Sequence, residues 1–112
     1  MDKVVFFAFV GEALCFNHVL INAFDMYEQG IEVKIVLEGQ SVKLLQEFDE
    51  SSSLVYKQVR EANLIVAICK ACSAKLGVLE YNEKSGIPLV GDMKGHPPMA
   101  PYIKAGYKII TI

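Results

Sequence analysis

The sequence lacks the features that mark a membrane-spanning or nucleic-acid-binding chain. No apolar stretch free of charged residues approaches the ~18 residues that a transmembrane helix needs. The 11 basic and 13 acidic side chains leave a net charge of −2, and the basic residues form no stripe. Electrostatic attraction to nucleic acid or to an anionic membrane surface is therefore not expected. We accordingly expect neither nucleic acid nor a membrane among the partners.

Cysteine is scarce, and its count is odd. The three cysteines are Cys15, Cys69 and Cys72, and they do not have the spacing of a disulfide framework. The segment that follows Met1-Asp2-Lys3 is strand-like, and no signal peptide is recognisable. Because free thiols persist in reducing compartments, these features predict a cytoplasmic protein.

What the chain does have is apolar residues, which make up 53% of its 112 positions. This length fits one domain that spans residues 1–112. A parallel sheet that is buried on both faces accounts for part of the apolar content. A domain of this size keeps too much surface to bury all of it, and a leftover apolar patch usually marks a partner surface. We therefore expect a homo-oligomer, for which a dimer is the commonest arrangement.

Strand-like and helix-like patterns alternate along the chain. Strand 31–38 alternates between apolar and charged residues, which indicates a position near a sheet edge. Ser41 is a predicted N-cap for the helix that follows. The alternation of elements predicts an α/β fold, a three-layer α/β/α sandwich with a mostly parallel sheet of about five strands. The predicted strands are 3–10, 31–38, 64–68, 87–90 and 107–112; the predicted helices are 13–29, 42–48, 54–62, 70–76 and 97–105, with a helical turn at 79–84.

The segment 62–78 is the part of the sequence with the clearest functional pattern. The apolar run 64–68 predicts a buried strand, Cys69 falls where that strand ends, and residues 70–76 have the composition of a helix. In open parallel sheets, ligands bind outside the carboxyl ends of the strands, where Cys69 is expected. A thiol at a helix N-terminus has a lowered pKa, and Lys70 beside it favours the thiolate further. We therefore interpret Cys69 as a reactive thiol, against the alternative of a buried small apolar residue.

Cys72 forms a Cys-x-x-Cys motif with Cys69, and this motif leaves several interpretations open. It is compatible with a redox dithiol, although the flanking residues differ from those of thioredoxin. In that case Cys72 is a helper or resolving thiol. As a metal site the pair supplies two ligands where a closed zinc site needs four. His18, His96 and Cys15 are conceivable additional ligands, but none has a diagnostic spacing.

Several stretches resemble the DsrE/DsrF-like sulfur-relay family, which is flavodoxin-like in general appearance. The first is the predicted strand followed by Cys69, a short alanine-rich helix and Gly77-Val78; others are residues 30–33, 36–42 and 99–107. The resemblance implies a compact α/β/α unit, a persulfide carried on Cys69, and association into trimers or hexamers. The chain departs from the family pattern in having Cys72 and in having Lys70 where a glycine often follows the cysteine.

The leading hypothesis is therefore a small cytoplasmic sulfur-transfer or thiol-redox protein with Cys69 as its catalytic thiol. Its partners are a sulfur donor and a sulfur acceptor protein, and the exchange requires no organic cofactor. Cys72 is expected to be a helper or resolving thiol, or else a packed helix residue; Lys70, His96 and Cys15 are expected neighbours of the site. The alternatives are a non-catalytic, oligomeric binding module of the same fold and a Cys-x-x-Cys metal-binding protein.

Overall fold

The fold is built on a five-stranded sheet in which every strand pair is parallel. A computed structural model describes residues 2–112. The spatial order of the strands is β4-β3-β2-β1-β5, so that β1, β2 and β3 lie inside the sheet and β4 and β5 form its edges. The strands are β1 (Lys3–Ala8), β2 (Glu32–Leu37), β3 (Ile65–Cys69), β4 (Leu89–Val90) and β5 (Lys108–Thr111).

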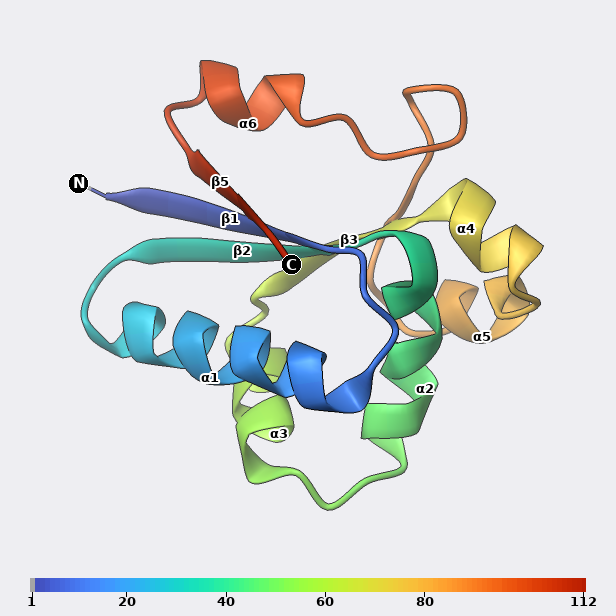
Figure 1. The fold of residues 1–112 in the computed structure, drawn as a ribbon, viewed down its shortest axis with the longest axis horizontal. Helices are drawn as coiled ribbons and strands as arrows, with labels where there is room; N and C mark the ends of the chain where they lie inside the picture. Colours follow the sequence, from blue (N-terminus) through green and yellow to red (C-terminus); the bar gives the residue numbers. More distant parts are fainter. Residues whose placement is uncertain (1) are drawn as a thin grey trace.

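Strand order determines which face of the sheet each helix covers. The connections from β1 to β4 all step in one direction, and right-handed crossovers therefore place their helices on one face. The step from β4 to β5 returns to the opposite edge and places its helix on the other face (Figure 1). The first face carries α1 (Ala13–Glu28), the 3-10 helix η1 (Gly39–Lys43), α2 (Leu44–Asp49), α3 (Leu54–Glu61), α4 (Lys70–Lys75) and α5 (Leu79–Glu83); the second carries α6 (Ala100–Lys104).

This arrangement confirms the predicted α/β sandwich, but its two outer layers are unequal. The first face holds the larger core, in which Phe16 and Leu20 of α1 pack against strand residues such as Ile35. On the second face, Phe7 is fully buried and its ring meets that of Tyr102 edge-on, with 5.7 Å between centroids. A single five-residue helix provides that contact, so the second layer is thin.

The expectation that strand 31–38 lies near a sheet edge is wrong, because β2 pairs with both β1 and β3. Its charged residues face the thin layer instead. Glu32 accepts a hydrogen bond from the Tyr107 hydroxyl, and the Lys34 ammonium lies 5.1 Å from the centre of the Tyr107 ring. Charged residues are tolerated on a strand where the layer that covers it is incomplete. The alternation of apolar and charged residues along β2 therefore reflects the thin second layer and not an edge position.

Two helix starts also differ from the prediction. Ser41 is not the N-cap of α2, which is Lys43. It lies inside η1, where its hydroxyl accepts a hydrogen bond from the Glu38 N–H and donates one to the Ala8 carbonyl at 2.6 Å, which ties the end of β1 to η1. The helix predicted from residue 97 begins at Ala100. Pro101 explains this start, because proline fits the first turn of a helix but removes a hydrogen bond at later positions. In residues 2–112 no helix is both long and apolar enough to cross a membrane.

Candidate functional site

Cys69 lies at the topological switch point of the sheet, where the connections from two neighbouring strands leave to opposite faces. From the carboxyl end of β3 the chain enters α4, whose Ala71 packs into the larger core. From the carboxyl end of β4 it crosses to the other face, where Met99 and Tyr102 pack. The connections of two neighbouring strands thus diverge to opposite faces, and such a switch point leaves a crevice where α/β proteins bind ligands. The predicted position of Cys69, at the carboxyl end of a strand, is confirmed.

The backbone around Cys69 fixes its sulfur against the start of α4. Cys69 is both the last residue of β3 and the N-cap of α4, with φ −63° and ψ 121°. Its Sγ accepts a hydrogen bond from the Cys72 N–H at 3.4 Å. Cys69 is fully buried, whereas Cys72 is partly exposed. Of the two sulfurs, that of Cys72 is therefore the one closer to solvent.

His96 reaches the carboxyl ends of β3 and β4 on a tight turn in the loop after β4. Met93 and His96 exchange two backbone hydrogen bonds of 2.9 Å across the turn. Lys94 and Gly95 both have positive φ, 52° and 94°, which is the pattern of a type I′ turn. The Gly95 carbonyl accepts a hydrogen bond from the Ala71 N–H at 2.9 Å. This bond links the turn directly to α4.

The turn places the His96 imidazole against both sulfurs of the Cys-x-x-Cys motif. The His96 Nδ1 atom lies 3.1 Å from Cys69 Sγ and 3.7 Å from Cys72 Sγ. The three donor atoms all lie within 4.8 Å of one another. Of the expected neighbours, His96 is therefore brought into the site. Cys15, in the first turn of α1, does not belong to this group of donor atoms, and Lys70 is exposed at the start of α4.

Glu38 is a fourth polar side chain at the site, and the sequence analysis missed it. It directly follows β2, its side chain is 11% exposed, and its Oε1 lies 3.5 Å from His96 Nδ1. The signal was present, because Glu38 ends an apolar strand at the same sheet edge as Cys69. Burial raises the pKa of the Glu38 carboxyl, and the charge of His96 opposes that rise.

The electrostatics of the site contradict the expected lowering of the Cys69 pKa. Burial raises the pKa of the Cys69 thiol to about 12. The hydrogen bond from the Cys72 backbone lowers it, whereas the Cys72 thiol and the Glu38 carboxylate raise it further. Burial therefore favours the protonated thiol of Cys69 over its thiolate. The six-residue helix α4 contributes one hydrogen bond, and desolvation outweighs it.

Comparison with known proteins identifies relatives. No family model matches the chain. A protein of Methanocaldococcus jannaschii, "Uncharacterized protein MJ0733", is 30% identical over 95 residues, which are 85% of this chain and 78% of the relative. The chain belongs to the family of MJ0733. A solved structure from Bacteroides thetaiotaomicron, "Conserved Protein of Unknown Function BT1422", matches with a TM-score of 0.72 and 25% identity, covering 99% of this chain and 95% of that one.

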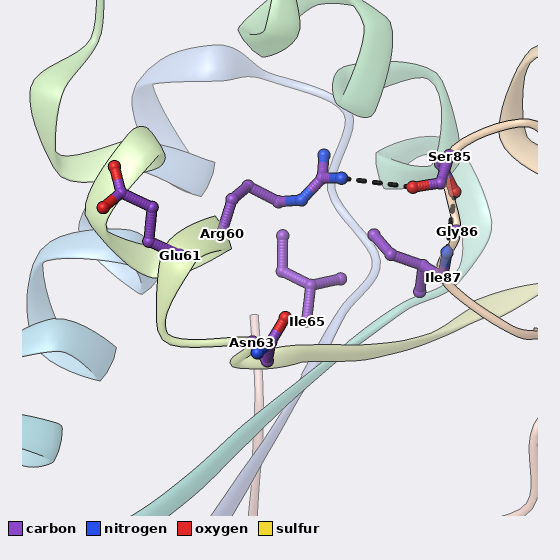
Figure 2. Close-up of a pocket in the computed structure, with 7 residues that line it drawn as sticks. All are labelled: Arg60, Glu61, Asn63, Ile65, Ser85, Gly86 and Ile87. Carbon is purple, nitrogen blue, oxygen red and sulfur yellow. Dashed lines mark hydrogen bonds between the residues drawn. The ribbon is translucent and has the colours of Figure 1, made fainter.

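A pocket lies at the opposite end of the sheet from Cys69, and it brings together no cysteine or histidine. The pocket, of about 410 Å³, includes Ile65, the first residue of β3. Figure 2 shows the Arg60 side chain extending to the Ser85 carbonyl, to which it donates a hydrogen bond. The same guanidinium pairs with Asp49 at 3.1 Å, so its charge is already matched. The pocket is lined by Arg60, Glu61, Asn63, Ile65, Ser85, Gly86 and Ile87.

Proposed function

We propose that this protein carries or exchanges sulfur on Cys69, as a small sulfur-transfer or thiol-redox protein of the cytoplasm. The observation that carries the proposal is the 3.1 Å contact between Cys69 Sγ and His96 Nδ1 at the switch point of the sheet. The thiolate is the reacting form of cysteine, and an adjacent imidazole is a base that can generate it. The resemblance to sulfur-relay proteins around Cys69 favours the same assignment.

The proposed transfer begins with a proton. The Cys69 thiol gives its proton to His96, and the thiolate attacks the outer sulfur of a donor persulfide, R–S–SH. A new S–S bond forms on Cys69 as the donor S–S bond breaks, and the leaving R–S⁻ takes the proton from His96. Cys69 then carries –S–SH. An acceptor thiolate attacks this outer sulfur in turn and leaves the Cys69 thiolate, which regains a proton.

Cys72 allows a second reaction of the persulfide on Cys69. Its Sγ lies in the same cluster as Cys69 Sγ, within 4.8 Å. A Cys72 thiolate that attacks Cys69 Sγ displaces hydrosulfide from the persulfide and forms the Cys69–Cys72 disulfide. A dithiol reductant then restores both thiols. Cys72 is thus the resolving thiol in the proposal, and hydrosulfide release is the reaction that depends on it.

Burial of Cys69 sets a condition on this chemistry. A donor cannot reach a fully buried sulfur, so the turn at 93–96 has to move before transfer. The Gly95–Ala71 hydrogen bond and the contacts of His96 hold that turn against α4. The same closure protects a persulfide from water and from unrelated thiols once it has formed. Slow reaction of Cys69 with general thiol reagents, and faster reaction with a true donor, is the expected behaviour.

Intact mass spectrometry after incubation with a small-molecule persulfide tests the proposal. The reduced wild-type protein is expected to gain the mass of one sulfur atom, and Cys69→Ser is expected not to. Cys15→Ser is the matched control, because Cys15 is a free thiol outside the cluster, and it should load like the wild type. No adduct on the wild type, or an undiminished adduct on Cys69→Ser, would show that Cys69 is not the carrier.

A non-catalytic, oligomeric binding module is the second candidate, and burial of Cys69 favours it. Large apolar side chains are also left exposed, among them Leu14 at 74% and Ile103 at 62%. A second copy that covers such residues would give the expected homo-oligomer. Light scattering after size exclusion should then report at least two chains; a monomer at micromolar concentration contradicts this. Cys69 labelling no faster than that of an unperturbed thiol, even with persulfide donors, would favour the module over the carrier.

A further inference from the structure

The side chains that cluster at Cys69, Cys72 and His96 are of the kinds that bind metal ions, in addition to being suited to nucleophilic chemistry. Two thiols and one imidazole nitrogen converge on one point from β3, α4 and the turn at 93–96. Thiolate and imidazole are the ligands that zinc takes in proteins. We propose that Cys69, Cys72 and His96 bind one Zn²⁺ ion, with Glu38 as the fourth ligand.

The distances between donor atoms support a tetrahedral ion. Zinc–sulfur bonds of about 2.3 Å and zinc–nitrogen bonds of about 2.0–2.1 Å place tetrahedral sulfur and nitrogen ligands about 3.5 Å apart. The two sulfur–nitrogen distances here are 3.1 Å and 3.7 Å, on either side of that value. Small rotations of the Cys72 and His96 side chains, both partly exposed, suffice to admit the ion.

Glu38 supplies a second and independent indication. An oxygen and a nitrogen ligand of a tetrahedral zinc ion lie about 3.3 Å apart, given bonds of about 2.0 Å. The Glu38 Oε1 atom lies 3.5 Å from His96 Nδ1, although Glu38 falls just outside the group of three converging donors. The Glu38 side chain also accepts a hydrogen bond from the Ser41 N–H at the start of η1, which holds it beside the cluster. Its carboxylate would bring a negative charge to a bound divalent ion.

Zinc binding goes beyond the proposed sulfur chemistry and does not depend on it. Both use the Sγ atom of Cys69, so a bound ion and a persulfide on Cys69 exclude each other. The zinc-loaded protein is therefore expected to resist sulfur loading until a chelator removes the ion. The two proposals can fail separately, because metal affinity is measured without a sulfur donor and sulfur loading is measured on chelator-treated protein.

Titration of the reduced, chelator-treated protein with Co²⁺ under anaerobic conditions tests the site. One equivalent of Co²⁺ should produce the visible bands of tetrahedral cobalt and a sulfur-to-cobalt charge-transfer band, and one equivalent of Zn²⁺ should abolish both. Cys72→Ser and His96→Gln, at partly exposed positions, should each weaken binding by about 10-fold or more. Glu38→Gln should weaken binding while the charge-transfer band remains, and Cys15→Ser should bind like the wild type.

Several outcomes would overturn the zinc site. One is the absence of tetrahedral cobalt bands in the reduced wild type; another is unchanged affinity in both Cys72→Ser and His96→Gln. Loss of binding in Cys15→Ser would place the site elsewhere. Cys69→Ser puts a hydroxyl at a fully buried position, so it is interpreted only if its circular dichroism matches the wild type. If the circular dichroism of Cys69→Ser differs from the wild type, the result rests on Cys72→Ser and His96→Gln, whose positions are partly exposed.

Discussion

Replacing Gly95 by alanine tests whether the turn at 93–96 holds His96 against the cysteines. Gly95 has φ +94°, and a Cβ atom there would lie 2.8 Å from the Cβ of Ala71. A side chain at positive φ costs about 1–2 kcal/mol. Because carbon atoms pack at about 3.5–4.0 Å, the turn and α4 would have to separate by about 1 Å. That shift weakens the 2.9 Å hydrogen bond between Gly95 and Ala71, which contributes about 1 kcal/mol.

Gly86→Ala is the matched control for this change. Gly86 has φ +85°, close to that of Gly95, but a Cβ there meets nothing within 4 Å. The control therefore carries the backbone cost alone, about 1–2 kcal/mol, while Gly95→Ala is expected to lose about 2–3 kcal/mol in all. Urea unfolding curves with equal slopes give both free energies of unfolding.

The turn should also govern access to Cys69. Labelling with iodoacetamide, followed by peptide mass spectrometry, measures the alkylation rate of each cysteine in the folded protein. We expect Cys69 to react faster in Gly95→Ala than in the wild type, because the displaced turn uncovers its sulfur, and to react at the wild-type rate in Gly86→Ala. Equal Cys69 rates in both variants, together with equal free energies of unfolding, would refute the role of the turn.

Three further predictions concern the scaffold. Phe7→Ala, at a fully buried position beneath α6, should lower the free energy of unfolding by about 3–5 kcal/mol, whereas Leu54→Ala, at a side chain 69% exposed, should change it by less than about 0.5 kcal/mol. Ser53→Ala removes the N-cap bond to the Tyr56 N–H and should cost about 1 kcal/mol; exposed Ser52→Ala should not. Burial and a hydrogen bond to Asp49 raise the pKa of Tyr56 above its ordinary value of 10.0. Above that pH the unfolded chain loses the phenol proton and the folded chain keeps it, so stability should fall with rising pH by up to about 1.4 kcal/mol per pH unit. Urea unfolding at pH 9 and pH 11 should show a smaller fall for Tyr56→Phe than for the wild type or for exposed Tyr27→Phe.

The order of strands and helices follows from local patterns, which is why it could be predicted. Apolar runs and helical spacing each involve neighbouring residues, and the parallel sheet follows from their alternation. The position of β2 inside the sheet could not be predicted in this way. Its exposed Glu32 and its Lys34 reflect the single short helix on the second face, and that thin layer results from the return of the chain from β4 to β5.

Of the candidate site, only the position of Cys69 could be predicted from local sequence, because it follows from where one strand ends. Cys69 could be placed because the strand and the cysteine are adjacent in sequence. His96 was an expected neighbour of the site, but its direct contact with Cys69 could not be predicted, since that contact spans 27 positions and depends on the path of the chain after β4. Glu38 contacts the site from β2 in the same way. The raised pKa of Cys69 was missed because the depth of burial is a tertiary property.

The number of protons that leave the cluster separates the two proposed states of the site. In the sulfur-transfer step His96 accepts one proton, and one thiolate forms at Cys69. A single thiolate beside a protonated imidazole is the form in which Cys69 can act as a nucleophile. Releasing both thiol protons beside the Glu38 carboxylate would gather three negative charges in a largely buried space, which only a bound cation can balance. Zinc loading should therefore release protons into a weakly buffered solution, whereas sulfur transfer from a persulfide should leave the proton count unchanged.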